Sequence, residues 1–434
     1  MPRSPNSDSD ALGTPSRRAA LRLLDAVLRR GEPLEQALVA ATRHVYGPDR
    51  GLAHAIAAEV LRRLPDLDAL IDSVTERPLP DDAKARMALR IALVQALVLG
   101  TPHHAAIATV LPLVDGGPRK LVHGVFGAIV RSGVLLPELP ALPPLVEARW
   151  EAAWGPAMTD GAAQAIAAPP PLDITLADPA ETEQWRVALG GTSLLPGHVR
   201  VADAGSVTEL PGFAEGRWWV QDIAASLPAR LLADAVRQQG EAPARAIDLC
   251  AAPGGKTLQL AAAGFTVAAV DVSNARIKRL RENLFRTRLK AEVIAGDVLR
   301  WQPEAPADAL LIDAPCSATG IFRRHPDVLH RVHPPIVEEM AALQARLWAR
   351  AADWVRPGGS LVFATCSLEP AEGEAQLARF LADRPDYAID APAAALLPEG
   401  IPVHAEGYVR TLPGMLAAAG GCDGFFMVRL RRQG

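Results

Sequence analysis

This chain of 434 residues has few cysteines and few aromatic residues, and it has no large excess of charge of either sign. Its 4 cysteines are too few for a disulfide scaffold, so we expect a reducing, cytoplasmic setting in which a thiol can have a chemical role. No apolar run reaches the roughly 18 residues of a membrane span, and the first residues lack the apolar segment of a secretory signal. The net charge of −4 excludes a strongly basic overall field, so any binding to nucleic acid must use local patches.

The first third of the sequence has the apolar spacing of helices. Thr14 and Pro15 suit a helix start, apolar residues then recur on one face, and Gly31 suits the helix end. Similar stripes follow with no strand-like alternation. They lie at 34–46, 52–64, 67–74, 83–99, 107–114 and 121–130. The pattern predicts an all-helical domain over 14–135.

The spacing of apolar residues changes after the proline-rich stretch 136–145, which we take as a domain boundary. Residues 146–212 mix a helical pattern with a strand pattern and predict a small α+β connector. From 217 to 434, short apolar runs alternate with helical segments, which is typical of a mostly parallel sheet covered on both faces. The runs lie at 246–249, 266–270, 291–294, 309–312 and 360–364. The predicted fold class is therefore multidomain α and α/β.

The first of these strands leads into a glycine loop, DLCAAPGGKT, at 248–257. A phosphate loop needs glycine five residues before Gly255, and Cys250 stands there; the GxGxxG pattern is also absent. Asp271 ends the second strand, 23 residues after Asp248 and close to the roughly 20 at which an acid meets a ribose hydroxyl. Asp297 and Asp313 follow the next two strands. Ligands bind beyond the carboxyl ends of such strands, so this series favours an adenosine-bearing ligand.

Two cysteines lie at the same predicted edge of the sheet. Cys316 comes just after Asp313, and Cys366 follows the fifth strand. At these places a thiolate can meet a substrate, whereas Cys422 and Cys250 fit the ordinary role of small buried hydrophobes.

The loop after Cys316 is rich in basic residues, with Asp327 as its one acid. Because the loop borders the expected site, we predict contacts with the phosphates of a nucleic-acid backbone. The residues concerned are Arg323, Arg324, His325 and Arg331. The histidine spacing matches no usual zinc pattern, so no metal is expected.

These motifs together resemble those of the RsmB/Sun family of RNA cytosine-5 methyltransferases, whose catalytic domain is Rossmann-like. The resemblance rests on DLCAAPGGKT, Asp271, Asp297, DAPCSATGIFRRHPD and ATCSLEP. The helical first third is similar to the NusB-type RNA-binding domain of that family. The resemblance implies methylation of C5 of a cytosine in 16S ribosomal RNA, with S-adenosylmethionine as cofactor.

The resemblance also implies a role for individual residues. Cys366 would be the nucleophile and Cys316 would assist product release. Asp271 would bind the ribose hydroxyls, Asp297 would lie near the adenine, and Asp313 would contact the cofactor, the target cytosine or both. The loop that would surround the cofactor consists of Cys250, Ala251, Ala252, Pro253, Gly254, Gly255 and Lys256.

Two alternatives stay open at this point. The substrate could be a transfer RNA, because the sequence does not fix which base leaves its stack. The chain could also be a non-catalytic RNA-binding assembly factor, although the intact pair Cys316 and Cys366 argues against a degenerate enzyme. We expect a monomer whose partner is 16S ribosomal RNA, with no membrane and no stable protein partner.

Overall fold

The computed structural model describes residues 13–240 and 244–434. The chain forms two compact units, which are described separately. The first holds the residues up to 149 together with 162–168 and 324–331, and the second holds the remainder. The connector predicted at 146–212 is therefore not a compact unit of its own: its strands belong to the second unit.

The first unit is helical, as its apolar spacing predicts. In α1 (Thr14–Arg30) the residues Ala20, Leu23 and Leu24 are fully buried, and Gly31 ends the helix in the left-handed conformation that glycine adopts readily. The other helices pack around the same core. They are α2 (Leu34–Ala41), α3 (Pro48–Arg62), α4 (Leu64–Ser73), α5 (Lys84–Leu97), α6 (His103–Val110), α7 (Gly117–Ser132) and the short α14 (Val328–Arg331).

In the sequence, two helices, α8 (Pro144–Trp154) and α9 (Pro156–Ile166), precede a small antiparallel sheet of the second unit. That sheet has the order β2-β1-β3, formed by β1 (Leu172–Leu176), β2 (His198–Val201) and β3 (Trp218–Val220), with α10 (Thr182–Ala188) beside it. Because β3 pairs with β1, the small sheet extends past the predicted boundary at 212.

The main sheet of the second unit has the strand order β10-β11-β8-β7-β4-β5-β6, and β9 also pairs with β11. Its neighbours from β6 to β8 are parallel, and β11 runs antiparallel to β8. The parallel strands are β4 (Arg245–Leu249), β5 (Thr266–Asp271), β6 (Glu292–Ala295), β7 (Ala307–Asp313) and β8 (Val355–Thr365). The others are β9 (Tyr387–Ile389), β10 (Val409–Thr411) and β11 (Phe425–Arg432). The predicted Rossmann-like sheet is confirmed.

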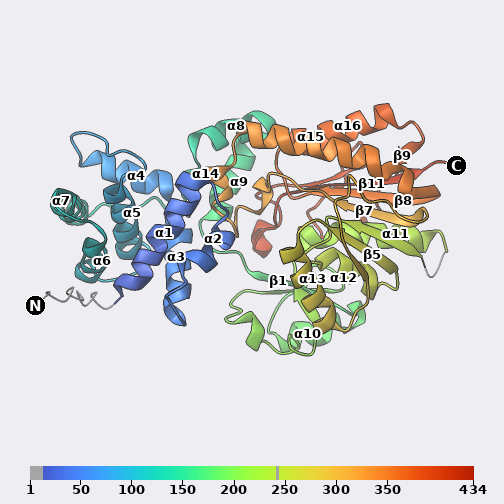
Figure 1. Cartoon of the computed structure of the whole chain (residues 1–434), viewed down its shortest axis with the longest axis horizontal. Helices are drawn as coiled ribbons and strands as arrows, with labels where there is room; N and C mark the ends of the chain where they lie inside the picture. The colour runs from blue at the N-terminus through green and yellow to red at the C-terminus, as the bar shows by residue number, and fades with distance from the viewer. Residues whose placement is uncertain (1–12, 241–243) are drawn as a thin grey trace, which may run out of the picture. The chain divides into compact units, whose positions relative to one another are not determined.

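Helices cover both faces of this sheet (Figure 1). One face carries α11 (Ile223–Gln238), α12 (Gly255–Ala262) and α13 (Asn274–Thr287), and the other carries α15 (Pro334–Ala351) and α16 (Glu374–Asp383). Apart from two charged residues in each, the strands β4 and β7 are apolar, and both are mostly buried because both of their faces are covered. No helix in the described ranges is both long enough and apolar enough to cross a membrane.

Candidate active site

The glycine loop after β4 is held in a conformation that only glycine fits at one position. Gly254 has φ of 109°, and a Cβ there would lie 2.4 Å from Cδ1 of Leu280 on α13. The loop therefore packs directly against α13 before α12 begins at Gly255. Burial raises the pKa of the Cys250 thiol to about 12, which leaves this cysteine an inert part of the loop.

The first turn of α12 and the end of β7 each supply one side chain to an ion pair beside this loop. The Lys256 ammonium lies 2.7 Å from Oδ2 of Asp313, the last residue of β7. They face a cavity of about 340 Å³, a size within the usual range for small-ligand sites. Among the predicted cofactor residues, those that line it are Ala251, Pro253, Gly255, Lys256 and Asp313.

The two other predicted cofactor aspartates lie at the same strand edge but outside that lining. Asp271, at the end of β5, is buried and accepts hydrogen bonds from the backbone N–H groups of Ala252, at 3.0 Å, and Ser273, at 2.8 Å. Asp297 follows β6; its side chain is 42% exposed and accepts from the N–H of Leu299 at 2.9 Å. Asp271 thus fixes the glycine loop, while Asp297 presents its carboxylate to solvent.

The two cysteines singled out from the sequence come together. Their sulfur atoms lie 3.4 Å apart, and both thiols are free and partly exposed. The hydrogen bond between the two sulfur atoms, together with burial, raises the pKa of Cys316 well above its usual value. Cys316 therefore keeps its proton in the resting protein.

A buried carboxylate that the sequence analysis did not single out joins the two cysteine loops. Glu372 is fully buried and accepts hydrogen bonds from the Ser317 N–H at 2.9 Å, the Ser367 hydroxyl at 3.0 Å and the Gln344 amide at 2.8 Å. Ser317 and Ser367 each follow one of the two cysteines directly. Burial raises the pKa of Glu372. The five residues between Cys366 and Glu372 carry no periodicity that could have predicted this placement.

Asp248 is a second buried carboxylate beneath the site. It is fully buried at the end of β4, and one of its oxygens accepts from the Thr257 hydroxyl at 2.5 Å. The other oxygen has no hydrogen-bond partner in the described ranges. Burial, with a smaller contribution from Asp313, raises the pKa of Asp248 to about 7.

The predicted RNA-binding loop does not form a solvated basic surface, which corrects the expectation for Arg323. This side chain is 2% exposed and lies between Asp222, at 3.0 Å, and Asp423, at 3.1 Å. It also donates to the Gly420 carbonyl at 2.8 Å. The acids that neutralise it come from more than 95 residues away in the sequence, so its local surroundings gave no sign of burial.

The rest of that loop belongs to the helical unit. Arg331 pairs with the buried Asp327 at 2.8 Å, and Asp327 also accepts from the Leu34 N–H at 3.3 Å. Arg324 and His325 are each half-buried, and burial lowers the pKa of His325. The loop residues thus serve mainly as packing and pairing groups. Within the described ranges, no group of histidine, cysteine and acidic side chains is arranged to hold a metal ion.

Comparison with known proteins identifies both parts of the chain. Residues 237–431 match the family of the 16S rRNA methyltransferases RsmB/F, and residues 14–131 match the NusB family. The ribosomal RNA small subunit methyltransferase B of Xanthomonas campestris is 36% identical over 98% of this chain and 98% of its own length. Its namesake in Klebsiella pneumoniae is 32% identical, with 95% of this chain and 97% of that protein covered.

Two solved structures share the fold. The crystal structure of PH0851 matches with a TM-score of 0.73 and 22% identity, over 97% of this chain and 99% of that one. NSun6 from Pyrococcus horikoshii, solved with SFG, matches with a TM-score of 0.56 and 18% identity, over 67% of this chain and 98% of that one.

The parallel sheet, its glycine loop and the acids at the strand ends define a Rossmann-like methyltransferase. The chain belongs to the RsmB/F family of 16S rRNA methyltransferases and carries a NusB-family domain in its first third. The cavity between the glycine loop and Asp313 fits the predicted cofactor, S-adenosylmethionine, because its polar groups sit where the strands end and its volume suits a small ligand.

Proposed function

We propose that the protein methylates C5 of a cytosine in 16S ribosomal RNA through a covalent bond between Cys366 and C6 of the base. The observation that carries the proposal is the 3.4 Å separation of the two sulfur atoms at the strand edge that also holds Lys256 and Asp313. The thiol that attacks C6 becomes part of the adduct, so another base must remove the C5 proton. A second thiol at contact distance supplies the group that resolves it.

When bound, S-adenosylmethionine supplies an electrophilic methyl group. Ala251, Pro253, Gly255, Lys256 and Asp313 line the cavity that would hold it, with Asp271 fixing the loop. Asp297, which follows β6, keeps the role near the adenine that the family resemblance implies.

The chain's own residues then have defined tasks. The Cys366 thiolate forms a bond to C6, and the C5–C6 π electrons shift into the ring. Asp313 protonates N3 with a proton that the Lys256 ammonium transfers to it across their ion pair. This makes C5 nucleophilic enough to accept the methyl group, and N3 returns its proton. Cys316, having released its own proton to solvent, takes the proton from C5. The electrons of that C–H bond restore the double bond, and the Cys366–C6 bond breaks.

The raised pKa of Cys316 supports assigning the nucleophile to Cys366 and the base to Cys316. A thiol that keeps its proton is a poor first nucleophile, but its thiolate, once formed, is a strong base. The target base must also leave its stack at a cost of a few kcal/mol, unless the RNA presents it single-stranded.

The first test is transfer of labelled methyl groups to purified, unmethylated 16S RNA, with bulk transfer RNA in parallel. We expect label in 16S RNA that digests to 5-methylcytosine. Label only in transfer RNA would support the proposed methylation reaction but would overturn 16S RNA as its substrate. Cofactor-independent binding of RNA, with no label in any RNA, would instead indicate an assembly factor.

The two cysteines are distinguished by separate variants. Cys366→Ala should abolish methyl transfer while leaving cofactor affinity nearly unchanged. Cys316→Ala should leave protein trapped on RNA as a band that survives denaturing electrophoresis, because the adduct forms but cannot resolve. A trapped band with Cys366→Ala, and none with Cys316→Ala, would reverse the two assignments.

A further inference from the structure

The helix α13 and the residues just after it are strongly basic in a chain whose net charge is −4. Residues 274–290 contain one acid, Glu282, and seven basic residues. The basic residues are Arg276, Lys278, Arg279, Arg281, Arg286, Arg288 and Lys290. By contrast, α15 on the opposite face of the sheet has two acids and two arginines. The segment 274–290 is therefore far more basic than α15.

One row of α13 side chains ends at the cofactor cavity, which only its last two members line. Arg276, Arg279, Asn283 and Arg286 are spaced three or four residues apart and so share a face of the helix. Arg276 donates to the Ala252 carbonyl, and Asn283 donates to the Pro253 carbonyl at 3.1 Å. Asn283 and Arg286 line the cavity that also contains Lys256 and Asp313. This row connects the surface of α13 with the site.

The neighbouring row faces solvent and combines cations with an aromatic ring. It consists of Lys278, Arg281, Phe285 and Arg288, which have the same three- and four-residue spacing. Phe285 is 88% exposed, so its ring is open to stack on a partner. The buried face of the helix is separate, formed by Ile277, Leu280, Leu284 and Thr287.

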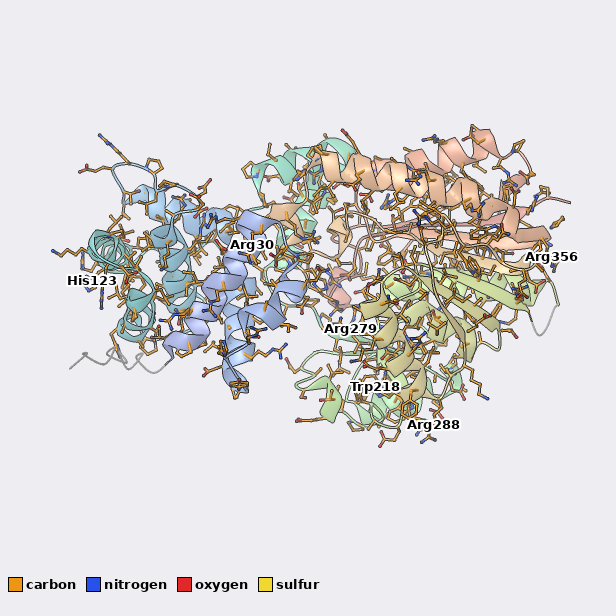
Figure 2. The ribbon with its side chains drawn as sticks, viewed as in Figure 1. Arg30, His123, Trp218, Arg279, Arg288 and Arg356 are labelled. Atoms are coloured by element: carbon orange, nitrogen blue, oxygen red, sulfur yellow. The ribbon has the colours of Figure 1, made fainter. Side chains whose placement is uncertain are left out.

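Several of these cations have no competing partner inside the protein. Arg279 and Arg281 are exposed, and neither makes a hydrogen bond or ion pair through its side chain within the described ranges. Lys278 is only loosely paired with Glu282, at 3.9 Å. Figure 2 shows Arg279 and Arg288 along α13 on the outside of the catalytic unit. Their charges are available to an anionic partner.

We propose that the exposed rows of α13 bind the single-stranded RNA segment next to the target base, with arginines on the phosphates and Phe285 stacked on a base. The proposal rests on the methylation of RNA proposed above and adds the surface that guides the strand to the cavity. The helix has 14 residues and is about 20 Å long, enough to follow several nucleotides. Cations interleaved with an exposed aromatic ring are the combination that binds single strands without reading their sequence.

The experiment compares two double variants that remove the same charge. Arg279→Ala/Arg281→Ala alters α13, and Arg346→Ala/Arg379→Ala alters exposed positions on α15 and α16 as the matched control. Affinity for a 16S RNA fragment is measured at several salt concentrations, alongside cofactor affinity and the steady-state constants of methyl transfer.

We expect the α13 variant to bind RNA about tenfold more weakly and its slope of log affinity against log salt to fall by about 1.4, or about 0.7 per lost phosphate contact. KM for RNA should rise while kcat and cofactor affinity stay near wild type. The control variant should behave as wild type. Equal losses in both variants would mean a general charge effect and would overturn the proposal.

Phe285 is tested separately because stacking is independent of salt. Phe285→Leu should weaken RNA binding about tenfold without changing the salt slope, and Phe285→Trp should retain wild-type affinity. Wild-type affinity for Phe285→Leu would overturn the stacking role.

The RNA-binding measurement does not depend on catalysis, so the two proposals can fail independently. If the wild-type protein forms no 5-methylcytosine but the α13 variant loses RNA binding, the RNA-binding role of α13 is supported and the proposed methylation reaction is overturned. Unchanged binding in a variant that methylates normally would overturn the surface and leave the chemistry standing.

Discussion

Two arginine-rich segments of the chain have opposite environments. The loop around Arg323 borders the cysteines in sequence, yet Arg323 is buried between Asp222 and Asp423, and Arg331 is paired with Asp327. On α13, Arg279 and Arg281 are exposed. A basic segment can therefore have one of two roles. Where acids from distant parts of the sequence pair with its arginines, the ion pairs stabilise the fold. Where no acid pairs with them, the arginines are available to bind an anionic ligand.

The largest expected difference between these segments is in stability. Arg323→Ala should lower the free energy of unfolding by about 3–5 kcal/mol, because it leaves two buried carboxylates without their cation. Urea denaturation measures this, with Arg279→Ala as the exposed control. Adding Asp423→Asn to Arg323→Ala should restore part of the loss. Equal effects of Arg323→Ala and Arg279→Ala would break the comparison.

Asp248 differs from Asp222 and Asp423 because it is a buried carboxyl group that forms no ion pair in the described ranges. Its pKa of about 7 in the folded protein lies above its ordinary value of 3.8, so its contribution to stability is full below about pH 4 and is lost as pH rises through about 7. Asp248→Asn should remove this decline and make the protein more stable than wild type at pH 8, by at most about 4 kcal/mol.

The measurement is the free energy of unfolding in urea at pH 4.5, 6 and 8. Glu304→Gln removes one acid from the exposed surface and controls for net charge. A decline with pH of the same size in Asp248→Asn and wild type would show that Asp248 is not its source.

Arg331 should show an intermediate effect. Its side chain is 19% exposed and its partner Asp327 is buried, so Arg331→Ala should cost about 1–2 kcal/mol, between the values for exposed and buried pairs. Thermal or urea unfolding of the full chain tests this. If Arg331→Ala lowers the free energy of unfolding as much as Arg323→Ala does, the exposure of the arginine does not determine the size of the effect.

The smallest expected effect on stability is that of Arg281→Ala. Removing an exposed side chain without a partner in the described ranges should change the free energy of unfolding by less than about 0.5 kcal/mol. Its RNA salt slope should nevertheless fall by about 0.7. A stability loss above 1 kcal/mol would show that α13 uses this charge internally.

Much of the fold follows from local patterns in the sequence. The stripe from Thr14 to Gly31 encodes α1 and its end, and the apolar runs at 246–249 and 309–312 encode β4 and β7. The position of the site at the strand ends could also be predicted, because parallel strands place their carboxyl ends at one edge. The boundary at 212 could not, since β3 joins the small sheet only by pairing with β1.

The local sequence was enough to select the candidate site residues: the glycine loop, the strand-end aspartates and the cysteines Cys316 and Cys366. How these residues are held, and which charges are free, depends on the tertiary structure. Glu372 joins the two cysteine loops, and Arg323 is neutralised by acids far away in sequence, because hydrogen bonds and ion pairs depend on distances in space. Residue types and periodicities are local properties, whereas burial and pairing are settled when distant segments pack together.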